Sequence, residues 1–440
     1  MAFINGKEVL FSPIIGVNGE SSGGDSGGGA GGGLDINGVI REYEVNAGAS
    51  VSAGDFVEFV AREFNSGAST WISACKLDNS RVLVAYCDGG NSSYGTAVIL
   101  RFADGFTSVG TKTVFNSAVT AFISAVALTD SKVLVAYCSG ATSAGSGTAV
   151  VLSISGTDIT LNSSKVFCAS NSDYFSAVAL TDSKVLVAYR NSTNGIAIVL
   201  TISGTTISAG TAKTFGSGTP NNISAVALTD SKVLVAYCDN GNNAYGTAIV
   251  LTISGTTISA GTKKVFLSNT ATGNFAVALT DSKVLVACQD RGNSWRGTAI
   301  VLTISGTTIS AGTAVAFTDS YAYNISAVAL TDSKALVAYR YNNFGRMVVF
   351  DINGTTISAG EMTTFEYESV TYESLVVFSE TSVLAVYNAA VVGKFADLAI
   401  NGTTIVFDGL VKKATSNSIR VGVAKTSGAE GEMVEVYCAV

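Results

Sequence analysis

Hydrophobic and polar positions follow a pattern that recurs seven times along the chain. The best-preserved copy spans residues 223–266, ISAVALTDSKVLVAYCDNGNNAYGTAIVLTISGTTISAGTKKVF. Its apolar runs are short, rich in β-branched residues and separated by TDSK, by a glycine- and asparagine-rich stretch and by SGTT. Such runs predict strands. Four strands are expected in this copy, at residues 223–228, 233–238, 247–253 and 258–266.

The core LTDSKVLVAY of this copy has counterparts 48 to 52 residues apart. They lie, with substitutions, at residues 77–86, 128–137, 180–189, 228–237, 279–288, 330–339 and 378–387. A period of about fifty residues with four strands is typical of propeller blades. The sequence therefore predicts an all-β fold, a seven-bladed β-propeller with about fifty residues per four-stranded blade.

The second strand of each repeat is apolar without alternation, as VLVAY at residues 233–237 shows. A strand needs apolar residues at successive positions only when both of its faces are buried. Blades stacked between two neighbours meet this condition. The pattern thus agrees with the propeller prediction.

The flanks differ from the repeats. Residues 20–33, ESSGGDSGGGAGGG, are expected to form a flexible linker after an N-terminal docking arm, residues 1–19. A small composite β-domain is expected from residues 34–66 and 411–440, with the propeller, residues 67–410, inserted between them.

Strand directions place the repeat's turns on two faces. The turns TDSK and SGTT share one face and are nearly constant among the repeats, whereas the loops after the second and fourth strands share the other face and differ in every repeat. The variable loops are rich in aromatic residues beside Asp, Asn and Arg, which suit stacking on sugar rings and hydrogen bonding to hydroxyls. An alternative is that these aromatic residues only pack loop against loop. The candidate ligand-binding residues are Trp71, Tyr94, Phe122, Tyr174, Arg190, Tyr245, Trp295, Tyr321, Tyr323, Arg340 and Phe344.

Composition narrows the chemistry. The formal net charge of −7 gives no basic surface for nucleic acid, and no apolar run is long enough to span a membrane. The absence of histidine removes histidine triads and most zinc enzymes. Seven cysteines, three of them directly after the second strand, are interpreted as small buried side chains. No cofactor or metal is expected, and the weak calcium candidates are Asp88, Asp239 and Asp290.

Several segments resemble structural proteins of bacteriophages that infect gut Firmicutes. The resemblance rests on the start MAFINGKEVLFSP, the segment VNAGASVSAGDFVEFV, the TDSKVLVAY and GTAIVLTISGTTIS repeats and the ending VGVAKTSGAEGEMVEVY. It implies a tail or capsid-surface protein of a virion. No signal peptide is expected, because Lys7 and Glu8 interrupt the apolar stretch at the start, so synthesis in the host cytoplasm is expected. The SGTT turns also give the repeats a loose similarity to sialidase-type propellers, although the sialidase boxes and arginine cluster are not matched.

These observations predict a virion-associated adhesion or decoration protein that is not an enzyme. Its variable face is expected to bind host or mucus glycans, and its N-terminal region to contact other virion proteins. A homo-oligomer is compatible with this reading. One alternative is a purely structural decoration or assembly protein that uses the propeller for protein contacts. A second alternative is a sialidase-like glycosidase.

Overall fold

The computed structural model describes residues 62–103, 106–140, 145–169 and 171–408. It also describes the strand segments 2–4, 7–9, 40–44, 56–60, 410–413, 422–424 and 433–438. Within these residues the chain forms strands and two short 3-10 turns, η1 (Asn240–Asn242) and η2 (Arg291–Asn293). The all-β prediction is confirmed. The expected linker, residues 20–33, lies outside the described residues.

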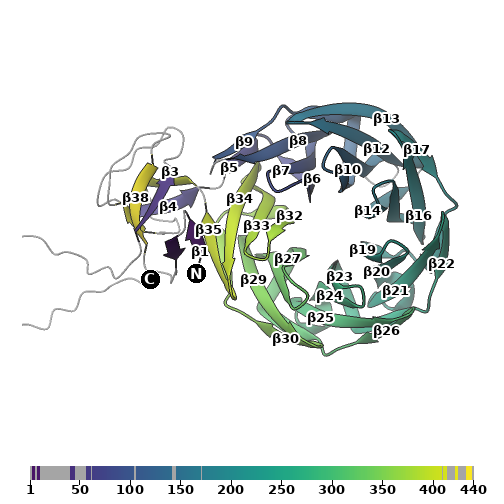
Figure 1. Ribbon diagram of the computed structural model, residues 1–440. Helices are drawn as coiled ribbons and strands as arrows, with labels where there is room; N and C mark the ends of the chain where they lie inside the picture. The colour runs from purple at the N-terminus through teal and green to yellow at the C-terminus, as the bar shows by residue number, and fades with distance from the viewer. Residues whose placement is uncertain are drawn as a thin grey trace, which may run out of the picture. The chain divides into compact units, whose positions relative to one another are not determined.

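The chain divides into two compact units, residues 63–395 and residues 1–62 with 396–440. Each repeat contributes three long antiparallel strands that pair in chain order, and Figure 1 shows these meanders around a common centre. In the seventh repeat the third strand, β34 (Val392–Asn401), crosses the boundary between the two units. The first strands are β6 (Ser69–Lys76), β10 (Thr113–Thr129), β14 (Ser172–Thr181), β19 (Asn221–Thr229), β23 (Lys264–Thr280), β27 (Val315–Ala329) and β32 (Val370–Ser379). The second strands are β7 (Arg81–Asp88), β11 (Lys132–Ser139), β15 (Lys184–Asn191), β20 (Lys232–Asp239), β24 (Lys283–Asp290), β28 (Lys334–Tyr341) and β33 (Ser382–Ala389). The third strands are β8 (Tyr94–Ala103), β12 (Ser146–Ser155), β16 (Asn194–Ser203), β21 (Tyr245–Ser254), β25 (Arg296–Ser305), β29 (Phe344–Asn353) and β34 (Val392–Asn401).

The fourth strand differs from the single strand expected. In the third repeat it consists of two pieces, β17 (Thr206–Ala209) and β18 (Lys213–Ser217), which both pair with β16. Between them the chain leaves the sheet after Gly210, whose N–H donates to the Val199 carbonyl. The corresponding outer strands elsewhere are β9 (Phe106–Val109), β13 (Asp158–Cys168), β22 (Thr257–Ala260), β26 (Thr308–Ala311), β30 (Thr356–Ala359), β31 (Thr363–Glu366) and β35 (Thr404–Asp408).

The seventh repeat takes part of its outer edge from the start of the larger unit. Strand β5 (Arg62–Asn65) lies in the segment that the sequence assigned to the small domain, yet it pairs with β34. A Cβ atom placed on Gly393 would lie 2.6 Å from the Phe64 ring. Phe115 covers Gly95 in the same way in the first repeat. Phe64 therefore fills in the seventh repeat the position that a fourth-strand phenylalanine fills elsewhere.

The segments expected to be loops between repeats are largely strand. Strands β10, β23 and β27 run without a break from the outer edge of one repeat into the first strand of the next. The prediction of a loop at these places was wrong, because paired backbone continues through residues that are not typical of strands. In each first strand a register shift interrupts the pairing near the variable face, for example between Ala121 and Ser124.

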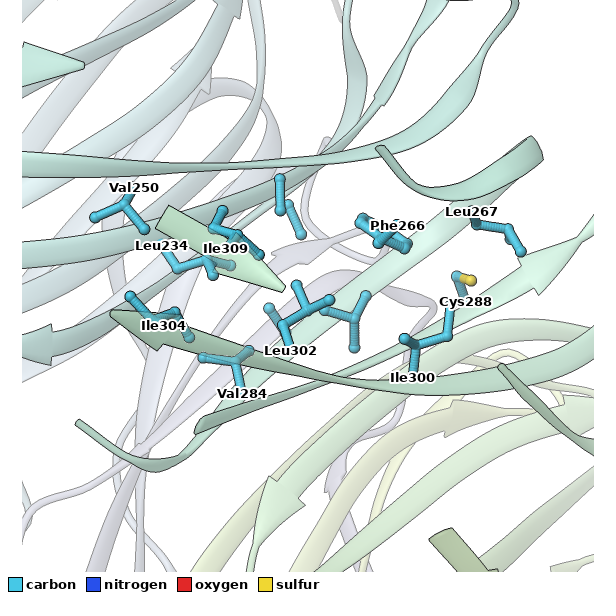
Figure 2. Packing of buried hydrophobic residues seen from close by; sticks show 14 of the residues in the cluster. Leu234, Val250, Phe266, Leu267, Val284, Cys288, Ile300, Leu302, Ile304 and Ile309 are labelled. Atoms are coloured by element: carbon cyan, nitrogen blue, oxygen red, sulfur yellow. The ribbon is translucent and has the colours of Figure 1, made fainter. Parts of the chain in front are cut away.

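The core lies between successive repeats. Figure 2 shows Leu234 and Val250 of the fourth repeat packed in one cluster with Val284, Ile300 and Leu302 of the fifth. Leu234, Val284 and Leu302 are fully buried. Burying one such side chain stabilises the fold by roughly 1.5–3 kcal/mol. The unbroken apolar second strands are thus explained by packing on both faces.

Serine hydroxyls join the first strands of neighbouring repeats. Ser224 Oγ accepts a hydrogen bond of 3.0 Å from the N–H of Ala276 in the next repeat. The same bond joins the N–H groups of Ala125, Ala177 and Ala225 to Ser73, Ser124 and Ser176. In the seventh repeat Ser374 Oγ accepts from the N–H of Ala74 in the first repeat at 3.0 Å. The same two repeats share an apolar cluster that includes Tyr86 and Val386.

The turns lie on two faces as the strand directions indicated. In the second repeat the N–H of Ile154, at the end of β12, donates to the Ser131 carbonyl in the TDSK turn at 2.8 Å. Four later repeats contain the equivalent bond. These backbone bonds join the TDSK turn to the end of the third strand on this face.

The smaller unit contains strands from both flanks. Its five-stranded sheet has the order β3 (Ile40–Glu44), β38 (Met433–Cys438), β37 (Gly422–Ala424), β4 (Phe56–Val60) and β36 (Leu410–Lys413). Within the expected docking arm, β1 (Ala2–Ile4) pairs with β2 (Lys7–Val9). In the described part of the chain, no helix is long and apolar enough to cross a membrane.

Two cysteines of the second strands, Cys87 and Cys238, are buried free thiols. Burial raises the pKa of the Cys238 thiol to about 11. A thiol of that kind is mostly protonated at neutral pH, so it packs as a small apolar side chain.

The serine contacts predict a measurable difference between two serines of one repeat. Ser224→Ala removes the acceptor of a buried N–H and should lower the free energy of unfolding by about 1–3 kcal/mol. Ser231→Ala, in the exposed TDSK turn, is the matched control and should change it by less than about 0.5 kcal/mol. Urea unfolding of both variants checks this. Equal effects of the two substitutions would contradict the structural role of Ser224.

Candidate functional site

In the first six repeats the register shift of the first strand nearest the variable face places one residue in the left-handed backbone region. The six described positions have φ between 49° and 61°. We call this position the left-handed slot. It lies beside the end of the second strand, at the variable face. Its described occupants, in repeat order, are Trp71, Phe122, Tyr174, Asn222, Gly273 and Asn324.

The slot has two kinds of occupant. Glycine and asparagine adopt positive φ readily, so Gly273 and Asn324 are suited to the backbone. Bulky aromatic residues are outliers there, and such strain is concentrated at functional sites. Trp71, Phe122 and Tyr174 therefore occupy the slot despite the backbone conformation.

The three aromatic slot residues form one continuous stack. The ring centroids of Trp71 and Phe122 are 4.1 Å apart, and those of Phe122 and Tyr174 are 5.1 Å apart. The Arg190 guanidinium lies 4.9 Å from the centre of the Tyr174 ring. We call these four residues the first arc. Its aromatic side chains are half-buried, with part of each ring packed on the core.

The charge of the first arc is balanced within the protein. Asp173 is buried, and both of its carboxylate oxygens accept hydrogen bonds from Arg190, one from Nε at 2.7 Å and one from a terminal nitrogen. This bidentate ion pair fixes the guanidinium in place. The first arc is therefore a rigid aromatic surface with no net charge.

A second stack lies in the fifth and sixth repeats. The Arg291 guanidinium is 4.0 Å from the centre of the Trp295 ring, and the Trp295 and Tyr321 rings are 5.9 Å apart. Tyr321 and Tyr323 are stacked at 6.1 Å, with planes 3° apart. The Arg340 guanidinium lies 4.9 Å from the Tyr323 ring centre. We call these five residues the second arc.

The structure thus brings together eight of the eleven predicted site residues, in two separate stacks. Phe344 instead contacts the Tyr367 ring at 5.5 Å. Tyr94 and Tyr245 begin strands β8 and β21 and are half-buried, and in the described part of the chain neither ring contacts another aromatic ring. These three residues belong to neither arc.

Arg291, which the sequence analysis did not select, belongs to the second arc, and two further arginines lie near it. The Arg346 guanidinium lies 4.2 Å from the Tyr341 ring centre. Arg296 pairs with Tyr321 across two strands. Aligning the seven repeats would have shown Arg346, because the first, second, fourth and fifth repeats have threonine at its position.

Glu373 is the other group that sequence reasoning missed. It occupies a first-strand position that holds isoleucine in four other repeats, as at Ile325. The side chain as a whole is half-buried, but both carboxylate oxygens are buried and have no hydrogen-bond partner among the described residues. Burial raises the pKa of Glu373 well above its usual range, and the nearby Arg340 lowers it only in part.

The three weak calcium candidates have structural roles. Asp290 Oδ1 accepts hydrogen bonds from the N–H groups of Gly292 and Asn293, and Asp88 Oδ1 accepts from the N–H of Gly90. Asp239 forms an ion pair of 3.1 Å with Lys263. These carboxylates shape the loops that they begin. Among the described residues, no group of three or more acidic, cysteine or histidine side chains could hold a metal ion.

Comparison with known proteins gives similarity in fold only. No protein-family model and no curated protein sequence matches the chain. A solved protein of unknown function from Dyadobacter fermentans is 13% identical, with a TM-score of 0.47 over 83% of this chain and 100% of that one. Aleuria aurantia lectin, solved with α-methyl-L-fucoside, is 13% identical, with a TM-score of 0.43 over 82% and 99%. Leech intramolecular trans-sialidase is 8% identical, with a TM-score of 0.46 over 76% and 68%. At these values no activity is carried over.

Glu373 predicts a pH-dependent change in stability. Its pKa is higher in the folded than in the unfolded chain, so stability due to this group is greatest below the unfolded pKa of about 4.3 and falls as pH rises. Glu373→Gln should therefore stabilise the protein at pH 8 more than at pH 4.5, measured by urea unfolding. Glu361→Gln, at an exposed position, is the control. A Glu373→Gln effect that is independent of pH would contradict the assignment.

Proposed function

We infer that the seven meanders are the blades of one seven-bladed β-propeller. The bond from Ala74 to Ser374 and the cluster shared by the first and seventh repeats support a ring of seven. The pairing of β5 with β34 supports closure of that ring by a strand from the start of the unit. Seven sequence repeats and seven meanders agree in number.

We propose that the protein is a glycan-binding protein without enzymatic activity and that its variable face carries the site. The observation that carries this proposal is the first arc. Three successive repeats place an aromatic residue in a backbone conformation that disfavours it, and the three rings form one stack. Aromatic surfaces with polar neighbours suit the apolar faces and hydroxyl edges of sugars.

The arrangement gives each part of the first arc a role. The half-buried rings supply a surface whose shape is fixed before binding, which lowers the entropy lost on association. Arg190, held by Asp173, can donate to ligand hydroxyls from nitrogen atoms of fixed position. On this view a neutral sugar stacks on the rings and is oriented by the guanidinium edge.

We further propose that this binding serves attachment of a virion to host or mucus glycans. The resemblance to bacteriophage structural proteins supports this context, with the N-terminal region contacting other virion proteins. A purely structural decoration protein is the second candidate. The rings of the first arc pack on the core clusters, and packing alone could explain their positions. This observation favours the structural candidate.

A substitution taken from the protein's own repeats tests the proposal. Trp71→Asn introduces the residue found in the fourth repeat's slot, Asn222, so the backbone should remain acceptable. We expect it to weaken binding at least tenfold, on a glycan array and by titration with the best sugar of that array. Thermal unfolding should shift by only a few degrees.

The control is Tyr367→Ala, which removes an exposed ring outside both arcs. It should bind as the wild type does. If Trp71→Asn binds glycans normally, or if no glycan binds the wild type, the structural candidate replaces the binding proposal.

A further inference from the structure

We propose that the second arc is a separate site for an acidic saccharide, a sugar ring that carries a carboxylate or sulfate group. This inference rests on the proposed glycan-binding function and deepens it. It assigns an acidic ligand to the second arc, in the fifth and sixth repeats, whereas the first arc takes a neutral sugar.

Arginine side chains in and beside the second arc carry positive charge that has no partner among the described residues. Four of the ten arginines of an acidic chain, Arg291, Arg296, Arg340 and Arg346, lie between residues 291 and 346. Among the described residues no hydrogen bond or ion pair engages any of their side chains. Three of the four instead lie over aromatic rings. The Nε atoms of Arg296, Arg340 and Arg346 are buried without an acceptor. Such donors normally have a partner.

A comparison within the chain isolates the difference between the arcs. Arg190 and Arg340 occupy the same position, directly after the VAY of the second strand. Across the strand pair Arg190 faces Asp173, whereas Arg340 faces Tyr323. The sixth repeat thus has the same guanidinium as the third, but an aromatic ring stands where the third repeat has the carboxylate. An external anion can take the place that Asp173 fills in the third repeat.

Glu373 does not supply the missing negative charge. It affects Arg340 electrostatically, but no ion pair joins their side chains in the described structure. Burial favours the neutral acid, because its pKa is raised well above the usual range. The guanidinium of Arg340 therefore keeps its charge. Other acidic groups near the arginines are engaged within the protein. Asp290 accepts from the N–H groups of its loop, and Glu366 and Glu368 both pair with Lys394.

A further acidic group, Asp319, helps to position the edge of the site. Its carboxylate accepts a hydrogen bond of 2.8 Å from the Tyr341 hydroxyl. This bond is the main cause of its lowered pKa, with smaller contributions from Arg346 and Arg296. Asp319 is exposed and offsets one of the two positive charges there. Four arginines and Lys394 against Asp290, Asp319, Glu366 and Glu368 leave a local excess of about one positive charge, counting Glu373 as neutral.

The exposed part of the second arc shows where a sugar ring would lie. Tyr321, with 43% of its surface exposed, lies between Trp295 and Tyr323. A ring stacked on this surface has Arg291 at one end of the arc and Arg340 at the other. A planar guanidinium binds carboxylate and sulfate oxygens in pairs.

The chain's two tryptophans allow each arc to be observed separately, because Trp71 lies in the first arc and Trp295 in the second. The test uses full-length Trp71→Phe, in which Trp295 alone fluoresces, and phenylalanine already fills the slot at Phe122. The probes are methyl glucoside, methyl glucuronide and glucose 6-sulfate, which share one ring and differ in charge. Full-length Trp295→Phe, titrated with the best neutral sugar of the array, reports on the first arc.

We expect at least one acidic probe to bind the second arc tenfold or more tightly than methyl glucoside, a difference of about 1.4 kcal/mol. Added salt should weaken this binding. Arg340→Gln, which introduces the residue of the fifth repeat, Gln289, should remove the preference, and exposed Arg291→Gln should reduce it. Arg101→Gln removes the same charge from an exposed position outside both arcs and should change nothing.

Whichever acidic probe binds identifies the group that is recognised. Equal binding of all three probes, or a preference that survives both arginine substitutions, would overturn the inference. If Trp71 still responds to a neutral sugar in that case, the proposed function stands without the acidic site. If neither tryptophan responds to any sugar, both proposals fail.

Discussion

The hydrogen bond between a serine hydroxyl and the backbone of the next repeat is the contact on which the larger unit depends. Ser73, Ser124, Ser176 and Ser224 each accept from the repeat that follows, and Ser374 accepts from the first repeat. A hydroxyl is small enough to leave the apolar second strands in contact. It also satisfies an N–H that would otherwise be buried without a partner, which fixes the spacing between repeats.

This framework separates stability from recognition. The contacts that join the repeats use serine, the apolar second strands and the turns TDSK and SGTT, which are nearly constant. The opposite face carries the left-handed slots and the loops after the second strands, where the repeats differ. Aromatic residues can occupy three slots because the strands on both sides hold the backbone in place. The strain is tolerated locally and does not spread to the framework.

The sequence was sufficient for the first three strands of each repeat and for the two faces, because both depend on local pattern and strand direction. It did not indicate the left-handed slot. A register shift changes which residue faces the neighbouring strand, but it leaves the residue types along the first strand unchanged. Sequence reasoning also missed that Trp71, Phe122 and Tyr174, about fifty residues apart, would form one stack. Glu373 was overlooked because a glutamate in a variable stretch resembles an exposed loop residue, whereas its position in the repeat is that of a buried isoleucine.

The equivalence of the slots has a consequence for how this protein can change over evolutionary time. Because most repeats meet their neighbours through nearly the same residues, a variable segment from one repeat fits the framework of another. Exchange of segments between repeats can therefore move an aromatic residue, an asparagine or an arginine to a new position on the face. The fold constrains the number of repeats, and the order of their binding residues is free to vary.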